Sequence, residues 1–224
     1  NLEIAPNFQP NNTSSCLVKL GNTHVCCSAI LEDRVPGFLR NSGKGWLTAE
    51  YGMLPSSTND RMDREAAKGK QSGRTQEIQR LIGRSLRCAV NLDILGEKTI
   101  KVDCDVISAD GGTRTASIIG GYVSLVRAVN QYKKSFNLSK SILTNQVAAI
   151  SVGVVKGTPC IDLDYIEDSS AEVDCNVVMA NDGQFIEFQS TGEEAKFTKK
   201  TILDFIDLVE RSIPDIFQIQ NAAI

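Results

Sequence analysis

Apolar side chains recur at strand spacing and then at helix spacing in two successive passes along this 224-residue chain, and this order constrains its fold most. Residues 17–31 predict a β-hairpin whose turn is Gly21–Asn22, and residues 100–106 alternate as a half-buried strand does. Helical spacing begins at Thr75 and again after Gly112. We therefore expect a duplicated α+β fold, with β-α units whose helices pack on mixed sheets.

The second half of the chain predicts a similar set of elements. Strands are expected at residues 147–155, 160–166, 173–180 and 184–189, and a helix at 198–213. Residues 33–60 are expected to be rich in loops. A chain of this length buries most of its apolar surface without a metal or disulfide. We expect one domain over residues 1–224, built of two pseudo-repeated halves at about 1–130 and 140–224.

Positive charge is concentrated in one segment of an acidic chain. The net charge is −3, but residues 61–87 hold eight basic side chains and three acidic ones. Because the local field steers a phosphate chain, such a segment can hold a polyanion. A solvated helix surface would explain the arginines at the end of this segment equally well. The side chains expected to contact a polyanion are Arg61, Arg64, Lys68, Lys70 and Arg80.

Composition and spacing argue against several classes of protein. The seven cysteines lack metal-ligand spacing and are expected to be small buried hydrophobes in a reducing compartment. His24 is the single histidine, so zinc sites and Ser/His/Asp hydrolysis have little support. No apolar run reaches the ~18 residues of a membrane span, and the first residues lack a signal-peptide pattern. A cytoplasmic location is expected, with no membrane partner.

A turn before the second long helix has the features of an anion site. Gly111 and Gly112 allow the backbone to approach an anion, and Thr113 is placed as an N-cap. Arg114 adds a planar fork that matches phosphate oxygens. An ordinary capped turn has the same pattern. Arg74 also lies just before a helix, so convergence of the two helix starts would clamp one phosphate between two arginines.

Acidic residues supply a second candidate site. The segment 160–168 places acids on a strand and its exit, with Asp168 at the end, and Asp174 begins the next strand. Oxygen ligands of this kind suit Mg²⁺ when water and substrate phosphate complete the coordination, although a solvated acidic loop has the same composition. Phosphate-binding arginines with a carboxylate-held cation suffice for phosphoryl transfer. The attacking group is water or inorganic phosphate, and the arginine pair favours phosphate.

Long blocks of this sequence resemble bacterial ribonuclease PH. The resemblance covers nearly the whole chain, and blocks of this length in this order are highly specific. They are Gly45–Pro55, Gly73–Arg84, Cys104–Val106, Ala109–Ala116, Asp162–Asp168, Glu172–Asp174 and Glu187–Glu193.

The resemblance implies a fold, a reaction and an assembly. The implied fold is the ribonuclease PH domain, which is similar to domain 2 of ribosomal protein S5. In the implied reaction, inorganic phosphate attacks the last 3′ phosphodiester of a transfer-RNA precursor and releases a nucleoside diphosphate. The implied assembly is a homo-hexamer, a trimer of dimers. The phosphate-site residues fall on Arg74, Gly112, Thr113 and Arg114, and the residues that bind the divalent cation fall on Asp168 and Asp174.

This chain departs from the family pattern at two places. The Gly-Arg-rich stretch that usually opens the family is absent before Asn1. Ser56–Ser57 follows Met-Leu-Pro where many relatives carry an arginine, so weaker RNA affinity is expected.

Two alternatives to a ribonuclease PH remain open. A non-catalytic RNA-binding ring subunit of an exosome-like assembly would usually lose the arginine or aspartate positions, and this chain keeps all four. An archaeal-type exosome catalytic subunit or a fragment of polynucleotide phosphorylase fits less well with the unbroken motif set and single-domain length.

Overall fold

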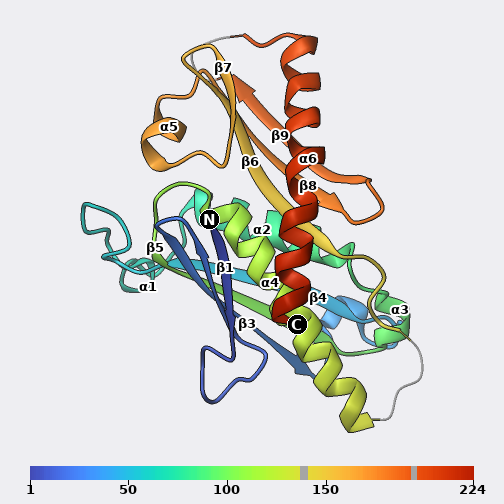
Figure 1. Ribbon diagram of the computed structural model, residues 1–224. Helices are drawn as coiled ribbons and strands as arrows, with labels where there is room; N and C mark the ends of the chain where they lie inside the picture. Colours follow the sequence, from blue (N-terminus) through green and yellow to red (C-terminus); the bar gives the residue numbers. More distant parts are fainter. Residues whose placement is uncertain (137–140, 193–195) are drawn as a thin grey trace.

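The computed structural model describes residues 1–136, 141–192 and 196–224, which form two β-sheets with helices between and beside them (Figure 1). The first sheet has the strand order β1-β2-β3-β5-β4, and the second has the order β7-β6-β8-β9. Strand β4 runs parallel to β5, and every other pairing is antiparallel. The first sheet is therefore mixed, as expected, whereas the second is purely antiparallel.

The bounds of the elements are as follows. The strands are β1 Leu2–Pro6, β2 Cys16–Leu20, β3 Thr23–Glu32, β4 Trp46–Met53, β5 Thr99–Ser108, β6 Val147–Val155, β7 Thr158–Ile161, β8 Val173–Ala180 and β9 Phe185–Gly192. The helices are α1 Glu65–Lys68, α2 Gly73–Arg87, α3 Leu92–Leu95, α4 Thr113–Phe136, α5 Tyr165–Ser169 and α6 Lys199–Ala223, with a 3₁₀ turn at Gly37–Leu39.

Strand β4 lies within residues 33–60, which are otherwise rich in loops as predicted, so the sequence missed this strand. It pairs with β5 from Trp46 opposite Thr99 onward. Its alternate residues Leu47, Ala49 and Tyr51 are buried against the core. Its parallel partner β5 begins far along the sequence, so the pairing forms only in the tertiary fold and leaves no local sequence signal.

The acidic segment after β7 also differs from the prediction. The expected strand at 160–166 ends at Ile161, because Asp162 adopts a left-handed conformation with φ of +57° and redirects the chain. Asp164 then caps α5, and its Oδ1 accepts a hydrogen bond from the Glu167 N–H at 2.8 Å. Asp168 consequently lies in a short helix and not at the exit of a strand.

Helix α4 packs between the two sheets and belongs to both cores. Ile118 and Val123 join the core under the first sheet, whereas Ile119 joins the core that β6, β8 and α6 form. The buried amide of Gln220 on α6 donates to the carbonyl of Ile119 at 3.1 Å and to that of Val147 at 3.0 Å. These contacts fix α4 against the second sheet and α6, and α4 therefore holds the two sheets in one arrangement.

The remaining predictions of the core are confirmed with small changes. The β2–β3 hairpin and the helices α2, α4 and α6 lie where the sequence predicted them. Helix α6 continues through Pro214 beyond its expected end at 213. The cysteines are free thiols, most of them buried. Within the described ranges, no helix combines the length and the apolar character that crossing a bilayer requires. The division of one domain into two pseudo-repeated halves stays a prediction.

Gly120 gives the first testable prediction. A Cβ at this position would lie 2.4 Å from Cγ2 of Val18 and 2.7 Å from Sγ of Cys27, both in the core. We expect Gly120→Ala to lower the free energy of unfolding by about 1–3 kcal/mol, because overpacking outweighs the gain in helix propensity. Urea denaturation measures this. Gly37→Ala, where a Cβ would meet no atom within 4 Å, is the control, and equal stabilities of the two variants would contradict the packing.

Candidate active-site cleft

One cleft, with a volume of about 1080 Å³, brings the two candidate sites together. Its walls come from β4 and β5, the segment from Leu54 to Ser72 that includes α1, the starts of α2 and α4, α5, and one face of the second sheet. The residues predicted from the sequence for the phosphate and metal sites all line it, namely Arg74, Gly112, Thr113, Arg114, Asp168 and Asp174. The structure thus provides the convergence of the two helix starts on which the predicted clamp depends.

A capped helix start positions Arg74. Ser72 is the N-cap of α2, and its Oγ accepts from the Thr75 N–H at 3.1 Å. Glu65 accepts from the Ser72 N–H at 3.0 Å and from the Thr75 hydroxyl at 2.8 Å. These bonds fix the first turn of α2, in which Arg74 is the second residue, so its side chain enters the cleft from a rigid element.

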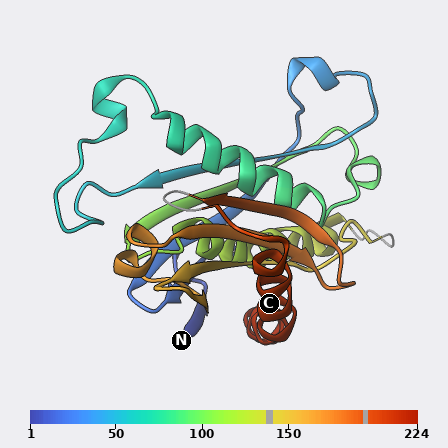
Figure 2. The same cartoon turned by 90° about the horizontal axis from the view of Figure 1, so that it is seen from above.

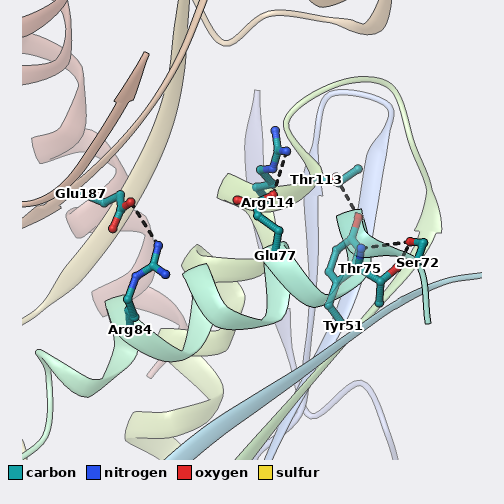
Figure 3. Close-up of polar contacts among 8 residues, drawn as sticks. All are labelled: Tyr51, Ser72, Thr75, Glu77, Arg84, Thr113, Arg114 and Glu187. Carbon is teal, nitrogen blue, oxygen red and sulfur yellow. Dashed lines mark hydrogen bonds and ion pairs between the residues drawn. The ribbon is translucent and has the colours of Figure 1, made fainter. Parts of the chain in front are cut away.

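The start of α4 differs in detail from the prediction. Thr113 was expected to be the N-cap, but it is the first helical residue, and Gly112 precedes it with φ of +58°. The hydroxyl of Tyr51 donates to Thr113 Oγ1 at 3.0 Å (Figure 3). Thr113 therefore joins the helix start to β4, and Gly112 provides the left-handed backbone that leads into the helix.

Arg114 is largely buried and only partly paired. Its side chain is 21% exposed, and Nη2 forms an ion pair with Glu77 Oε2 at 3.1 Å (Figure 3). Its Nε is buried and has no hydrogen-bond partner within the described part of the chain. Glu77 comes from α2, one turn after Arg74. The ion pair orients the guanidinium and leaves one of its charged donors unsatisfied.

Tyr51 is a buried residue of the cleft whose pKa depends first on burial and then on its polar and charged neighbours. Burial raises the pKa of its hydroxyl, and the bond to Thr113 and the charges of Arg74 and Arg114 oppose this shift. Both guanidinium groups are therefore near enough to this buried phenol, which lines the cleft, to oppose the rise in its pKa. Sequence patterns gave no role to Tyr51, which lies in the strand that they failed to predict.

A close backbone contact joins the anion turn to the acidic segment. Gly111 has φ of +77°, and a Cβ there would lie 2.3 Å from the carbonyl oxygen of Leu163 and 2.8 Å from the carbonyl carbon of Asp164. The side chain of Leu163 is buried, and its N–H donates to Ser151 Oγ on β6 at 3.3 Å. Leu163 is thus attached to the second sheet. Asp110 Oδ1 also accepts from the Tyr165 N–H at 3.3 Å. The contact sets the position of α5 relative to α4.

The face of the second sheet that lines the cleft is polar. Asn176 lies opposite Ser151 on β6 and Gln189 on β9, and Asp174 lies opposite Thr191. All five line the cleft. The alternate residues of β8, Cys175 and Val177, pack in the core with α6. Strand alternation therefore directs Asp174 into the cleft.

The first sheet contributes an acid that sequence analysis did not select. Asp105 on β5 lines the cleft, and burial, together with the neighbouring charge of Glu50, raises the pKa of its carboxyl. Asp103, two residues earlier, has its pKa raised first by burial and then by Glu50 and Asp105. The alternation of β5 was predicted, and it could have placed these acids on one face. Only the fold places that face beside the cleft.

The predicted polyanion-binding residues divide into two groups. Arg64 and Lys70 line the cleft. Arg61 and Lys68 form exposed ion pairs with Asp63, at 3.7 and 3.0 Å, and Arg80 is exposed on α2 outside the cleft lining. The segment that includes α1 extends away from the sheets (Figure 2). The structure therefore does not gather all five residues at one place.

Helix α2 also contacts the second sheet. Arg84 Nη2 pairs with Glu187 Oε1 on β9 at 3.1 Å (Figure 3). Glu187 belongs to the resembling block 187–193, whose last residue, Glu193, lies outside the described residues.

Comparison with known proteins gives two family matches. A model described as domain 1 of the 3′ exoribonuclease family matches residues 1–129, and a model of domain 2 matches residues 145–211. Ribonuclease PH of Corynebacterium kroppenstedtii is 51% identical over 223 residues, which covers 100% of this chain and 88% of that protein.

Solved structures share the fold at low identity. The crystal structure of rice (Oryza sativa) Rrp46 aligns with a TM-score of 0.79 and 16% identity, covering 99% of this chain and 93% of that one. An Archaeoglobus fulgidus exosome with RNA bound to the active site aligns with a TM-score of 0.78 and 19% identity, covering 97% and 88%. These likenesses confirm the expected fold.

Gly111→Ala tests the contact between the anion turn and the acidic segment. We expect it to lower the free energy of unfolding by about 2 kcal/mol more than Gly183→Ala does, because both sites have positive φ but only Gly111 faces backbone. Urea denaturation measures the difference. We also expect weaker binding of inorganic phosphate by calorimetry in Gly111→Ala alone. Equal effects of the two substitutions would show that the close contact is absent.

Proposed function

Because the chain belongs to the ribonuclease PH family of 3′ exoribonucleases, we propose that it shortens RNA from the 3′ end by phosphorolysis, with inorganic phosphate as the attacking group. The proposed substrates are the 3′ ends of transfer-RNA precursors. The proposed catalytic side chains are Arg74, Arg114, Asp168 and Asp174.

The buried Nε of Arg114 is the observation that supports this proposal most. A buried donor without a partner carries a desolvation penalty, which an anion removes by accepting its hydrogen bond, and a phosphate oxygen suits a guanidinium fork. Arg74 enters the same cleft from α2. Two arginines on rigid helix starts favour a free dianion over a neutral water molecule as the group to be held, and hence phosphorolysis over hydrolysis.

The residues of the cleft have distinct tasks in the proposed reaction. Arg74 and Arg114 hold inorganic phosphate, with the Thr113 hydroxyl and the backbone at Gly112 beside it. A phosphate oxygen bonds to the phosphorus of the last linkage, and the bond from that phosphorus to the preceding 3′ oxygen breaks. The leaving oxygen takes up the proton that the attacking phosphate loses. The products are a nucleoside diphosphate and RNA shortened by one nucleotide.

A divalent cation would be held by Asp168 from α5 and Asp174 from β8, which line the same cleft. No cluster of three or more His, Cys, Asp or Glu capable of holding a metal occurs among the residues described. Two carboxylates fit Mg²⁺, which is commonly held by one or two carboxylates together with water and substrate phosphate. When bound, the ion neutralises charge on the reacting phosphates.

The RNA itself would lie along the basic side chains at the cleft. Arg64 and Lys70 are positioned for this within the cleft, and Arg61, Lys68 and Arg80 would act outside it. We further propose a cytoplasmic homo-hexamer, arranged as a trimer of dimers, in which neighbouring subunits add basic segments around a precursor. Because all four proposed catalytic side chains line one cleft, we favour a catalytic chain over a non-catalytic RNA-binding ring subunit.

The products of RNA incubation test this function. With inorganic phosphate we expect nucleoside diphosphates, and without it we expect no release of nucleotides. Arg74→Ala and Arg114→Ala should each lower the rate about 100-fold or more, because each removes charge stabilisation from the reacting anion. Arg34→Ala, at an exposed ion pair outside the cleft, is the control. Nucleoside monophosphates, or parent rates in both cleft variants, would refute the proposal.

Loss of the cation gives a separate prediction. We expect EDTA to abolish phosphorolysis and Mg²⁺ to restore it. Asp174→Asn should lower the rate by about two orders of magnitude while the chain stays folded, because it removes a charge that holds the ion. Rates measured against Mg²⁺ concentration, with circular dichroism to confirm folding, check both. Full activity in EDTA would contradict the metal role.

A further inference from the structure

The cleft has apolar surface as well as charge. Leu54, Met62 and Tyr165 are large hydrophobic residues that line the cleft while remaining exposed. A phosphate-binding site alone has no use for such surface, because ions and their water contact polar groups. A nucleotide does, since its base has two apolar faces next to its charged phosphate.

Tyr165 is the aromatic residue in this lining whose ring is accessible. Its exposure is 57%, and no hydrogen bond or ring contact of its phenol occurs within the described ranges. Tyr51 also lines the cleft, but it is 4% exposed and its hydroxyl is bound to Thr113. Of the two tyrosines, Tyr165 alone presents a face on which a base can stack.

The position of Tyr165 relative to the proposed chemistry is fixed. Tyr165 and Asp168 are three residues apart in α5, so they share one side of the helix, and both line the cleft. The backbone of Tyr165 is bound to Asp110, which Asn22 holds in turn at 2.9 Å. The capping box at Asp164 closes the first turn of α5 and so fixes the backbone of Tyr165. The ring therefore projects from a fixed position near Asp168, a proposed ligand of the cation.

We propose that the ring of Tyr165 is a stacking platform for the base of the 3′-terminal nucleotide of RNA. This inference rests on the proposed function and names a binding subsite for its substrate. Stacking tolerates every base, because each base has a π face, and an enzyme that removes successive nucleotides needs such tolerance. Tyr165 would thus position the last nucleotide without selecting its sequence.

Steady-state kinetics at saturating phosphate test the platform. Tyr165→Ala should raise KM for RNA at least about fivefold, the loss expected from one stacked base, with kcat changed less than twofold. Tyr165→Phe should keep the parent KM, because it keeps the ring. Ile166→Ala is the matched control, since Ile166 is the neighbouring residue of α5, is 74% exposed and lies outside the cleft lining. Parent KM in Tyr165→Ala would overturn the proposal.

A substrate without the terminal base separates stacking from a structural effect. On RNA that ends in an abasic ribose, Tyr165→Ala should cause no further loss, because the partner of the ring is already missing. An equal loss on normal and abasic RNA would show that the substitution disturbs α5 and Asp168, and would also overturn the proposal.

A binding measurement keeps this inference separable from the proposed function. RNA carrying 2-aminopurine as its last base should lose fluorescence on binding to the parent chain and to Tyr165→Phe, and keep it with Tyr165→Ala. This readout needs no turnover. Unquenched fluorescence with the parent chain would refute the platform even if phosphorolysis is observed, whereas quenching without nucleoside diphosphates would refute the reaction alone.

Discussion

The contact between the backbone of Gly111 and that of Leu163 and Asp164 is the constraint on which the cleft depends. The anion turn belongs to the first half of the chain and the acidic segment to the second, and a Cβ at Gly111 would lie 2.3 Å from the Leu163 carbonyl. Leu163 is in turn buried beside Gly153 of β6. Backbone packed against backbone cannot shift as side chains do, so the proposed phosphate and cation sites keep one separation.

Rigid elements on either side maintain this arrangement. Helix α4 is packed between both cores, so its first turn cannot move without disturbing the sheets. The Arg114–Glu77 ion pair joins α4 to α2, and the Arg84–Glu187 pair joins α2 to β9. A chain with a net charge of −3 can still hold an anion, because Arg74 and Arg114 both line the cleft, and the partial burial of Arg114 strengthens its field.

Local patterns predicted the elements whose partners are near in sequence. The β2–β3 hairpin, the alternation of β5 and the apolar face of α2 follow from spacing alone. Strand β4 was missed because its partner β5 begins 46 residues after β4 ends. The residue pattern predicts strand beyond Ile161 because the left-handed turn at Asp162 has no glycine to mark it. The residues predicted for the phosphate and cation sites line one cleft, and their roles stay a prediction. Spacing alone does not show that they converge, since convergence depends on how α4 joins the two sheets.

The distance between bound phosphate and bound cation tests the central claim most directly. Mn²⁺, a paramagnetic substitute for Mg²⁺, should strongly enhance the relaxation of the ³¹P resonance of inorganic phosphate in the presence of the chain. The enhancement should disappear when either Asp174 is changed to Asn or Arg114 to Ala, because each removes one of the two neighbours. If the parent chain with Mn²⁺ enhances the relaxation no more than Mn²⁺ does without the chain, the two sites do not meet.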